Sequence, residues 1–97
     1  MNWFAVVLLF ESEVADGKDG KRLQEESVRL FKGNTKEEAE EKARLLGTQE
    51  EVSYRNTYGS EVCWRYVEIT EVQDLCENDI FDGVEVFSRM SYADNNK

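Results

Sequence analysis

The chain has 97 residues, of which 40% are hydrophobic and 34% are charged, which is the size and composition of one soluble globular domain. Its 21 acidic and 12 basic residues give a net charge of −9, so binding to the phosphates of nucleic acids is disfavoured. Histidine is absent, which removes the usual general base and the commonest zinc ligand. No window approaches the roughly 18 apolar residues of a membrane-spanning helix, so we expect no membrane association.

The cysteines give a further indication of the cellular compartment. Cys63 and Cys76 do not have the spacing of a metal site. A chain of this size and apolar content does not need a disulfide to fold. We therefore expect reduced thiols in a cytoplasmic protein, with no metal and no cofactor.

An apolar run dominates the N-terminus. Trp3 to Phe10 contains eight consecutive apolar residues and predicts a strand that extends to about Glu13. Because successive side chains of a strand point to opposite faces, both faces of this strand are apolar. Each face therefore needs its own cover.

A second strand and a helix follow. Glu25 to Lys32 has the alternating pattern of a half-buried strand, with Val28 and Leu30 on one face, and should pair antiparallel with the first strand. The sequence from Thr35 to Glu38 is a capping box, which predicts the start of a helix.

This helix should run from Thr35 to Leu46, with Gly47 as its stop. Its apolar stripe is narrow and rich in alanine, so the helix has to lie close against the sheet. A helix of ordinary width covers roughly two or three strands. One helix therefore leaves part of the predicted sheet uncovered, and another layer has to bury that part.

Three more strands are predicted after the helix, at Glu51 to Arg55, Glu61 to Val72 and Val84 to Ser91. The first two form a hairpin whose turn ends in Gly59, a residue that can adopt positive φ. Strict alternation along the long strand would place Ile69 on the face opposite to the aromatic side chains.

The predicted fold class is therefore α+β. It has an antiparallel sheet of four to five strands in ββαβββ order, with the helix, about Thr35 to Leu46, packed on one face. Residues 1–92 should form a single domain, and residues 93–97 a disordered polar tail.

Several short motifs are spread along nearly the whole chain. They are Met-Asn-Trp-Phe-Ala-Val at the start, Leu8-Leu9-Phe10-Glu11, Glu37-Glu38-Ala39, Lys42-Ala43, Tyr54-Arg-Asn56-Thr-Tyr58-Gly59, Val62-Cys-Trp64-Arg-Tyr66 and Asp82-Gly83-Val-Glu85-Val86-Phe87-Ser88-Arg89. Together they resemble a family of short bacterial proteins catalogued as a domain of unknown function. The resemblance implies no activity, cofactor or catalytic residue.

Few candidates for catalysis remain without histidine. A carboxylate pair such as Glu11 with Glu85 could act in acid–base chemistry, but accidental proximity is expected among 21 acidic residues. Cys63 lies within a strand, where a cysteine is usually a small packing residue, and Cys76 has no histidine to activate it. We therefore expect a protein that is not an enzyme, with no catalytic residue.

Aromatic and charged side chains supply the candidate partner or ligand surface. Its members are Trp3, Tyr54, Tyr58, Trp64, Tyr66, Arg65, Glu85 and Arg89. The preferred hypothesis is a non-enzymatic protein-interaction module that self-associates, as a homodimer, to cover apolar sheet surface. One alternative is a small-molecule site on an aromatic sheet face, which predicts a deep pocket floored by Trp64 or Tyr66. The other is an acidic inhibitor of a basic protein partner.

Overall fold

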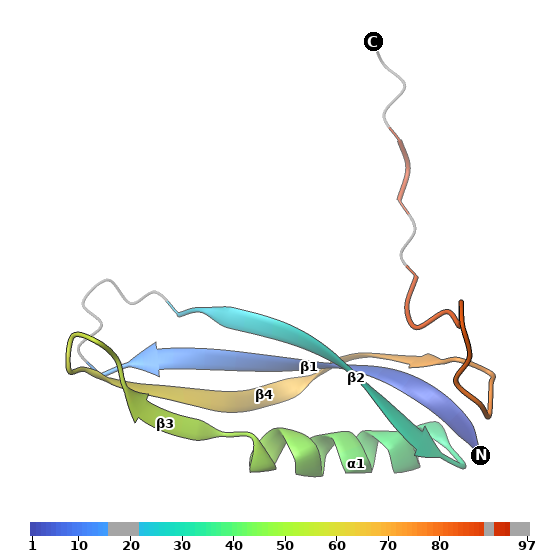
Figure 1. Cartoon of the computed structure of the whole chain (residues 1–97), viewed down its shortest axis with the longest axis horizontal. Helices are drawn as coiled ribbons and strands as arrows, with labels where there is room; N and C mark the ends of the chain where they lie inside the picture. The colour runs from blue at the N-terminus through green and yellow to red at the C-terminus, as the bar shows by residue number, and fades with distance from the viewer. Residues whose placement is uncertain (16–21, 89–90, 94–97) are drawn as a thin grey trace.

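The computed structural model describes residues 1–15, 22–88 and 91–93 (Figure 1). In chain order the elements are strand β1 (Asn2–Val14), strand β2 (Gln24–Gly33), helix α1 (Lys36–Gln49), strand β3 (Val52–Arg55) and strand β4 (Glu61–Asp74). The strands form one antiparallel sheet in the order β2-β1-β4-β3. The domain is therefore α+β, with the element order ββαββ. No helix of the described residues is long and apolar enough to cross a membrane.

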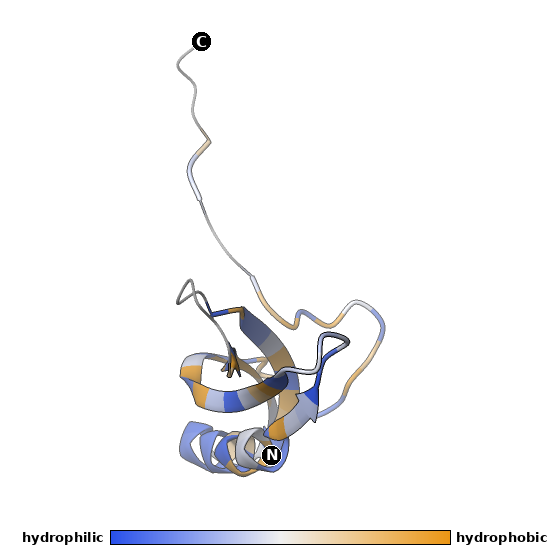
Figure 2. Ribbon diagram, turned by 90° about the vertical axis from the view of Figure 1, so that its left-hand side faces the viewer, coloured by the Kyte–Doolittle hydropathy of each residue, from blue (hydrophilic) through white to orange (hydrophobic). Residues whose placement is uncertain are grey.

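The fifth strand predicted at Val84 to Ser91 is wrong for the residues that the structure describes there, since none of them is in a strand. The chain turns before this segment: Gly83 has a φ of +86°, and the Val84 amide donates to the Phe81 carbonyl at 3.1 Å. Residues 84–88 lie on the side of the sheet away from α1, and among the described residues no strand pairs with them (Figures 1 and 2). Their alternating hydrophobicity reflects partial burial without a ladder of backbone bonds.

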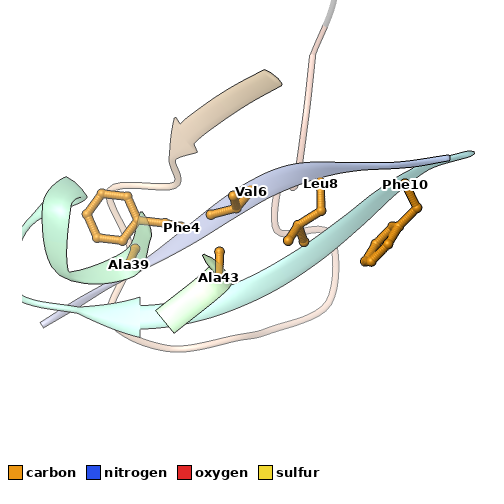
Figure 3. Close-up of a cluster of buried hydrophobic side chains, with 6 residues drawn as sticks. All are labelled: Phe4, Val6, Leu8, Phe10, Ala39 and Ala43. Atoms are coloured by element: carbon orange, nitrogen blue, oxygen red, sulfur yellow. The ribbon is translucent and has the colours of Figure 1, made fainter. Parts of the chain in front are cut away.

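The core forms where α1 lies against β1 (Figure 3). The four apolar side chains of β1 that point to the helix are at most 4% exposed, and the two helical alanines that meet them are fully buried. This cluster consists of Phe4, Val6, Leu8, Phe10, Ala39 and Ala43. Because alanine adds little bulk, the helix axis can approach the sheet closely.

The helix begins as the capping motif predicts and ends later than expected. The Thr35 hydroxyl accepts a hydrogen bond from the Glu38 amide at 3.1 Å, while the Glu38 carboxylate accepts from the Asn34 amide instead of the Thr35 amide. Gly47 is not a stop, since α1 continues to Gln49. A Cβ atom at Gly47 would lie 2.6 Å from the Tyr66 ring, so this glycine allows close contact between α1 and β4.

Strand β4 departs from the alternation expected from its sequence. Its pairing with β1 shifts twice, and the two shifts leave Val67 and Thr70 without partners in the register. The first shift turns Ile69 toward the helix, beside the aromatic side chains, and the second restores the original phase at Val72. The prediction that Ile69 faces away from Trp64 is therefore wrong.

The other face of β1 is also buried in part. Ala5 and Val7 are 0% and 4% exposed, although α1 lies on the opposite side of the sheet. After β4 the chain is held beside Trp3 by two backbone hydrogen bonds. The Trp3 amide donates to the Glu77 carbonyl, and the Leu75 amide donates to the Trp3 carbonyl. Residues 78–88 then lie on the side of the sheet away from α1 (Figures 1 and 2).

Candidate interaction surfaces

The side chains predicted as one surface lie on both faces of the sheet. Trp3 and Arg65 belong to the face away from α1, whereas Tyr54, Trp64 and Tyr66 belong to the helix side. The remaining members lie elsewhere: Tyr58 is 91% exposed in the hairpin turn, Glu85 is exposed in the C-terminal segment, and Arg89 is outside the described residues. The structure therefore offers two separate candidate surfaces.

The first surface is a groove on the helix side, beyond the C-terminal end of α1. Its volume is about 310 Å³. The lining residues are Phe10, Glu25, Glu50, Val52 and Trp64, contributed by all four strands and the end of the helix. We call this the aromatic groove. It exists because α1, with 14 residues, is about 21 Å long, whereas β1, with 13 residues, is about 43 Å long.

The aromatic side chains of this region differ in their surroundings: Tyr66 is packed against Phe10 and α1, whereas Trp64 lines the groove. The Tyr66 ring meets the Phe10 ring edge to face, with centroids 6.2 Å apart, and burial raises the pKa of the Tyr66 hydroxyl. Trp64 lines the aromatic groove and donates from Nε1 to the Tyr54 hydroxyl at 3.4 Å. The groove therefore has Trp64 at its wall, while Tyr66 is packed beneath the helix.

An ion pair borders the aromatic groove. Both guanidinium nitrogens Nη1 and Nη2 of Arg29 lie 2.7 Å from the Glu50 carboxylate, and Nε donates to the Ser27 hydroxyl. The hydrogen bonds from Arg29 hold the pKa of Glu50 below its usual value, and Glu50 raises the pKa of Arg29. Arg29 thus ties β2 to the end of α1.

The second surface is the face of the sheet away from α1, at the free side of β2. Val28 pairs with Val7 and Leu30 pairs with Ala5, so these aliphatic residues continue the apolar face of β1 outward. Val28 is 46% exposed and Leu30 is 37% exposed, in contrast to their buried partners. We call the surface formed by Val28 and Leu30 the aliphatic face.

The residues considered for catalysis have ordinary structural partners. Glu11 accepts from Gln24 at 2.9 Å and from Arg22 at 3.1 Å, and these contacts lower its pKa, whereas a general acid needs a raised one. The Cys63 sulfur lies 3.0 Å from the Ser53 hydroxyl, and the thiol of Cys76 is free and exposed. Among the described residues, no three acidic or cysteine side chains converge as a metal site would require.

Sequence reasoning missed the key features of both surfaces. The alternation places Val28 and Leu30 on one face of a half-buried strand, and the structure shows that the opposite face, with Ser27, Arg29 and Phe31, turns to the helix. Which side chains of β2 turn to the helix depends on the register of β2 on β1, because a shift of one residue would exchange the two faces. The alternation within β2 does not give that register. The sequence feature that indicates the aromatic groove is the length of α1, which is too short to cover the whole of β1.

Comparisons with known proteins assign a family and no activity. A family model described as "Domain of unknown function (DUF4288)" matches residues 3–88. Neither the curated proteins nor the solved structures contain a match to this chain.

Proposed function

The chain belongs to the DUF4288 family, a domain of unknown function, and we propose that it is a protein-interaction module that associates with a second copy of itself. The observation that carries this proposal is the aliphatic face described above. Val28 and Leu30 are 46% and 37% exposed and lie in register with buried residues of β1. Contiguous exposed apolar surface on a sheet is typical of a site where another chain binds.

The position of these residues supports a chain as the partner in preference to a small molecule. Val28 and Leu30 lie on β2, the last strand at one side of the sheet. An edge strand presents backbone donors and acceptors in addition to side chains, and a second strand can satisfy both. An edge-to-edge homodimer would thereby bring the aliphatic side chains of the two copies into contact and complete the hydrogen bonding of the edge.

The oligomeric state tests this proposal directly. We expect light scattering to give the mass of a dimer at ~100 μM, a concentration at which even micromolar association is visible. Val28→Asp should yield the monomer, because the introduced carboxylate would lie against an aliphatic side chain of the second copy. Val52→Asp is the matched control, since Val52 is similarly exposed (51%) on the opposite edge strand, and it should remain dimeric. A wild-type protein that is monomeric at ~100 μM would contradict the proposal.

A second candidate function is binding of a ligand or basic partner in the aromatic groove. The supporting observation is that Phe10, Val52 and Trp64 line the groove together with the carboxylate of Glu25, while Glu50 at its border is already paired with Arg29. An apolar aromatic wall beside negative charge favours a ligand with a ring and a positive charge. The net charge of −9 likewise favours a basic protein as the partner in the inhibitor hypothesis.

Tryptophan fluorescence distinguishes this second function from the first. In a Trp3→Phe variant, Trp64 is the sole tryptophan, and it reports on the aromatic groove alone. We expect benzylamine to shift its emission and benzoate, which has a ring of the same size but the opposite charge, to have no such effect. A Trp64→Phe variant, in which Trp3 reports from the other face, should respond to neither. Equal responses to the two compounds would argue against a cation-selective groove.

A further inference from the structure

We infer that β2 pairs antiparallel with β2 of a second copy, in a register centred on Arg29. This inference rests on the proposed self-association and specifies its interface. The partner is a second copy of this chain, and the joined sheet would have both α1 helices on the same side. Three properties of β2 lead to this arrangement: its free edge, its aliphatic pair and the order of its charges.

The first property is the direction of the backbone groups in β2. The Leu23 carbonyl accepts from the Ser12 amide of β1 at 2.8 Å, so odd-numbered positions of this strand direct their groups toward β1. Even-numbered positions, including Val28 and Leu30, direct theirs toward the free edge. Within the described part of the chain, no strand pairs with that edge. The Lys32 carbonyl on this edge accepts from the flexible Lys42 ammonium, which a strand amide could replace.

The second property is the match of side chains across a two-fold axis. Directly opposed residues of an antiparallel pair lie on the same face of the sheet. The two-fold axis must therefore pass midway between one residue of β2 and the same residue of the partner. With Arg29 on the axis, Val28 lies opposite the partner's Leu30, and each aliphatic side chain meets another. Glu26 then lies opposite the partner's Lys32, and the symmetry repeats both pairs. Such apolar and opposite-charge pairs are the favourable ones between antiparallel strands.

Neighbouring registers lack this complementarity. An axis at Val28 places Glu26 against the partner's Leu30, and an axis at Leu30 places Val28 against the partner's Lys32. Each of these pairs sets a charged side chain against an aliphatic one. An axis at Ser27 has the same fault, because it opposes Glu26 and the partner's Val28. Of these registers, only the one centred on Arg29 pairs aliphatic side chains with each other and Glu26 with Lys32.

The register centred on Arg29 brings two arginines to the axis, and the structure reduces the cost of this approach. Each Arg29 turns toward its own helix, where Nη1 and Nη2 lie 2.7 Å from the Glu50 carboxylate. Each guanidinium is therefore neutralised within its own chain before the copies meet. Lys32 is held on the other face, with Nζ 5.6 Å from the centroid of the Trp3 ring, where it can reach the partner's Glu26.

Charge exchange tests this pairing. Glu26→Lys and Lys32→Glu should each raise the dimer dissociation constant about five- to thirtyfold, since each change creates two like-charge pairs. The double variant should return it close to the wild-type value, because exchanged charges pair again. Glu68→Lys is the matched control on the same face of β4, away from the edge, and should behave as wild type. Dimers that are insensitive to the single exchanges would overturn this interface without affecting self-association itself.

Cysteine substitution locates the axis independently. In a Cys63→Ser, Cys76→Ser background, single cysteines are placed at positions 28, 29 and 30, and folding is checked by circular dichroism. Only the residue on a two-fold axis lies directly opposite its own copy, about 4.5–5.5 Å away between Cβ atoms, near the range for a disulfide. We expect Arg29→Cys to cross-link fastest under oxidation. Fastest cross-linking at Val28→Cys or Leu30→Cys would overturn the register, and a monomeric wild type would overturn the proposed self-association as well.

Discussion

Gly47 has a different role from the one that its position near the end of the helix suggests. Glycine often follows the last turn of a helix, but here the last turn includes it. A Cβ atom would lie 2.6 Å and 2.9 Å from two carbons of the Tyr66 ring and 3.2 Å from Leu8. Contacts this short require the ring itself to move, because the atoms are close to the β4 backbone. The glycine is therefore a packing residue.

We predict that Gly47→Ala destabilises the protein by roughly 0.5–2 kcal/mol. Alanine would add up to about 1 kcal/mol of helix propensity, but overpacking against Tyr66 costs about 1–3 kcal/mol. Denaturant unfolding measures the difference. In a Tyr66→Ala background the same substitution should be neutral or stabilising, and an equal loss of stability in both backgrounds would exclude the ring as its cause.

At the scale of elements, the Arg29–Glu50 pair joins strand β2 to helix α1 and makes their contact sensitive to acid. Because Arg29 lowers the pKa of Glu50 in the folded protein, the contact contributes stability above the ordinary glutamate pKa. That contribution is lost as the pH falls through the lowered value. Protonation of Glu11, whose pKa is also lowered, acts in the same direction.

We predict that Glu50→Gln lowers stability at pH 7 by a few tenths to about 1 kcal/mol, the range for partly exposed ion pairs. It should also reduce the loss of stability between about pH 6 and pH 3, because the glutamine amide does not take up a proton in that range. The measurement is the free energy of unfolding in urea across this pH series. Glu85→Gln, at an exposed position of the C-terminal segment, is the matched control and should leave the stability at pH 7 unchanged. A steeper pH dependence for Glu50→Gln would contradict the assignment.

The elements that the sequence predicted correctly are those specified by local patterns. The apolar run of β1, the cap at Thr35 and the turn that ends in Gly59, with its φ of +84°, each depend on a few neighbouring residues. The later end of α1 and the shifts in β4 depend on contacts between elements, which periodicity does not contain. The segment from Val84 to Ser88 has a strand-like alternation, but no strand of the described residues pairs with it.

At the scale of the whole molecule, the candidate surfaces follow from unequal coverage of one sheet. Sequence reasoning identified the need for two layers of cover and named one residue, Trp64, that lines the aromatic groove. It could not divide the candidate residues between the faces, because Trp3 and Trp64 lie on opposite sides only through the register of β4 on β1. The aliphatic face became visible only once β2 was placed at the edge of the sheet.

The two shifts in β4 also bear on which changes in chain length the fold can absorb. Seven residues of β1, from Phe4 to Phe10, pair with nine residues of β4, from Tyr66 to Asp74. Deletion of Val67 or Thr70 would remove a bulge and leave the flanking residues on their present faces. β1 contains no unpaired residue of this kind between Phe4 and Phe10. A deletion there would turn the side chains on one side of the deleted residue to the opposite face of the sheet. Single deletions at these two positions of β4 are therefore better tolerated than deletions in β1, the strand with which β4 pairs.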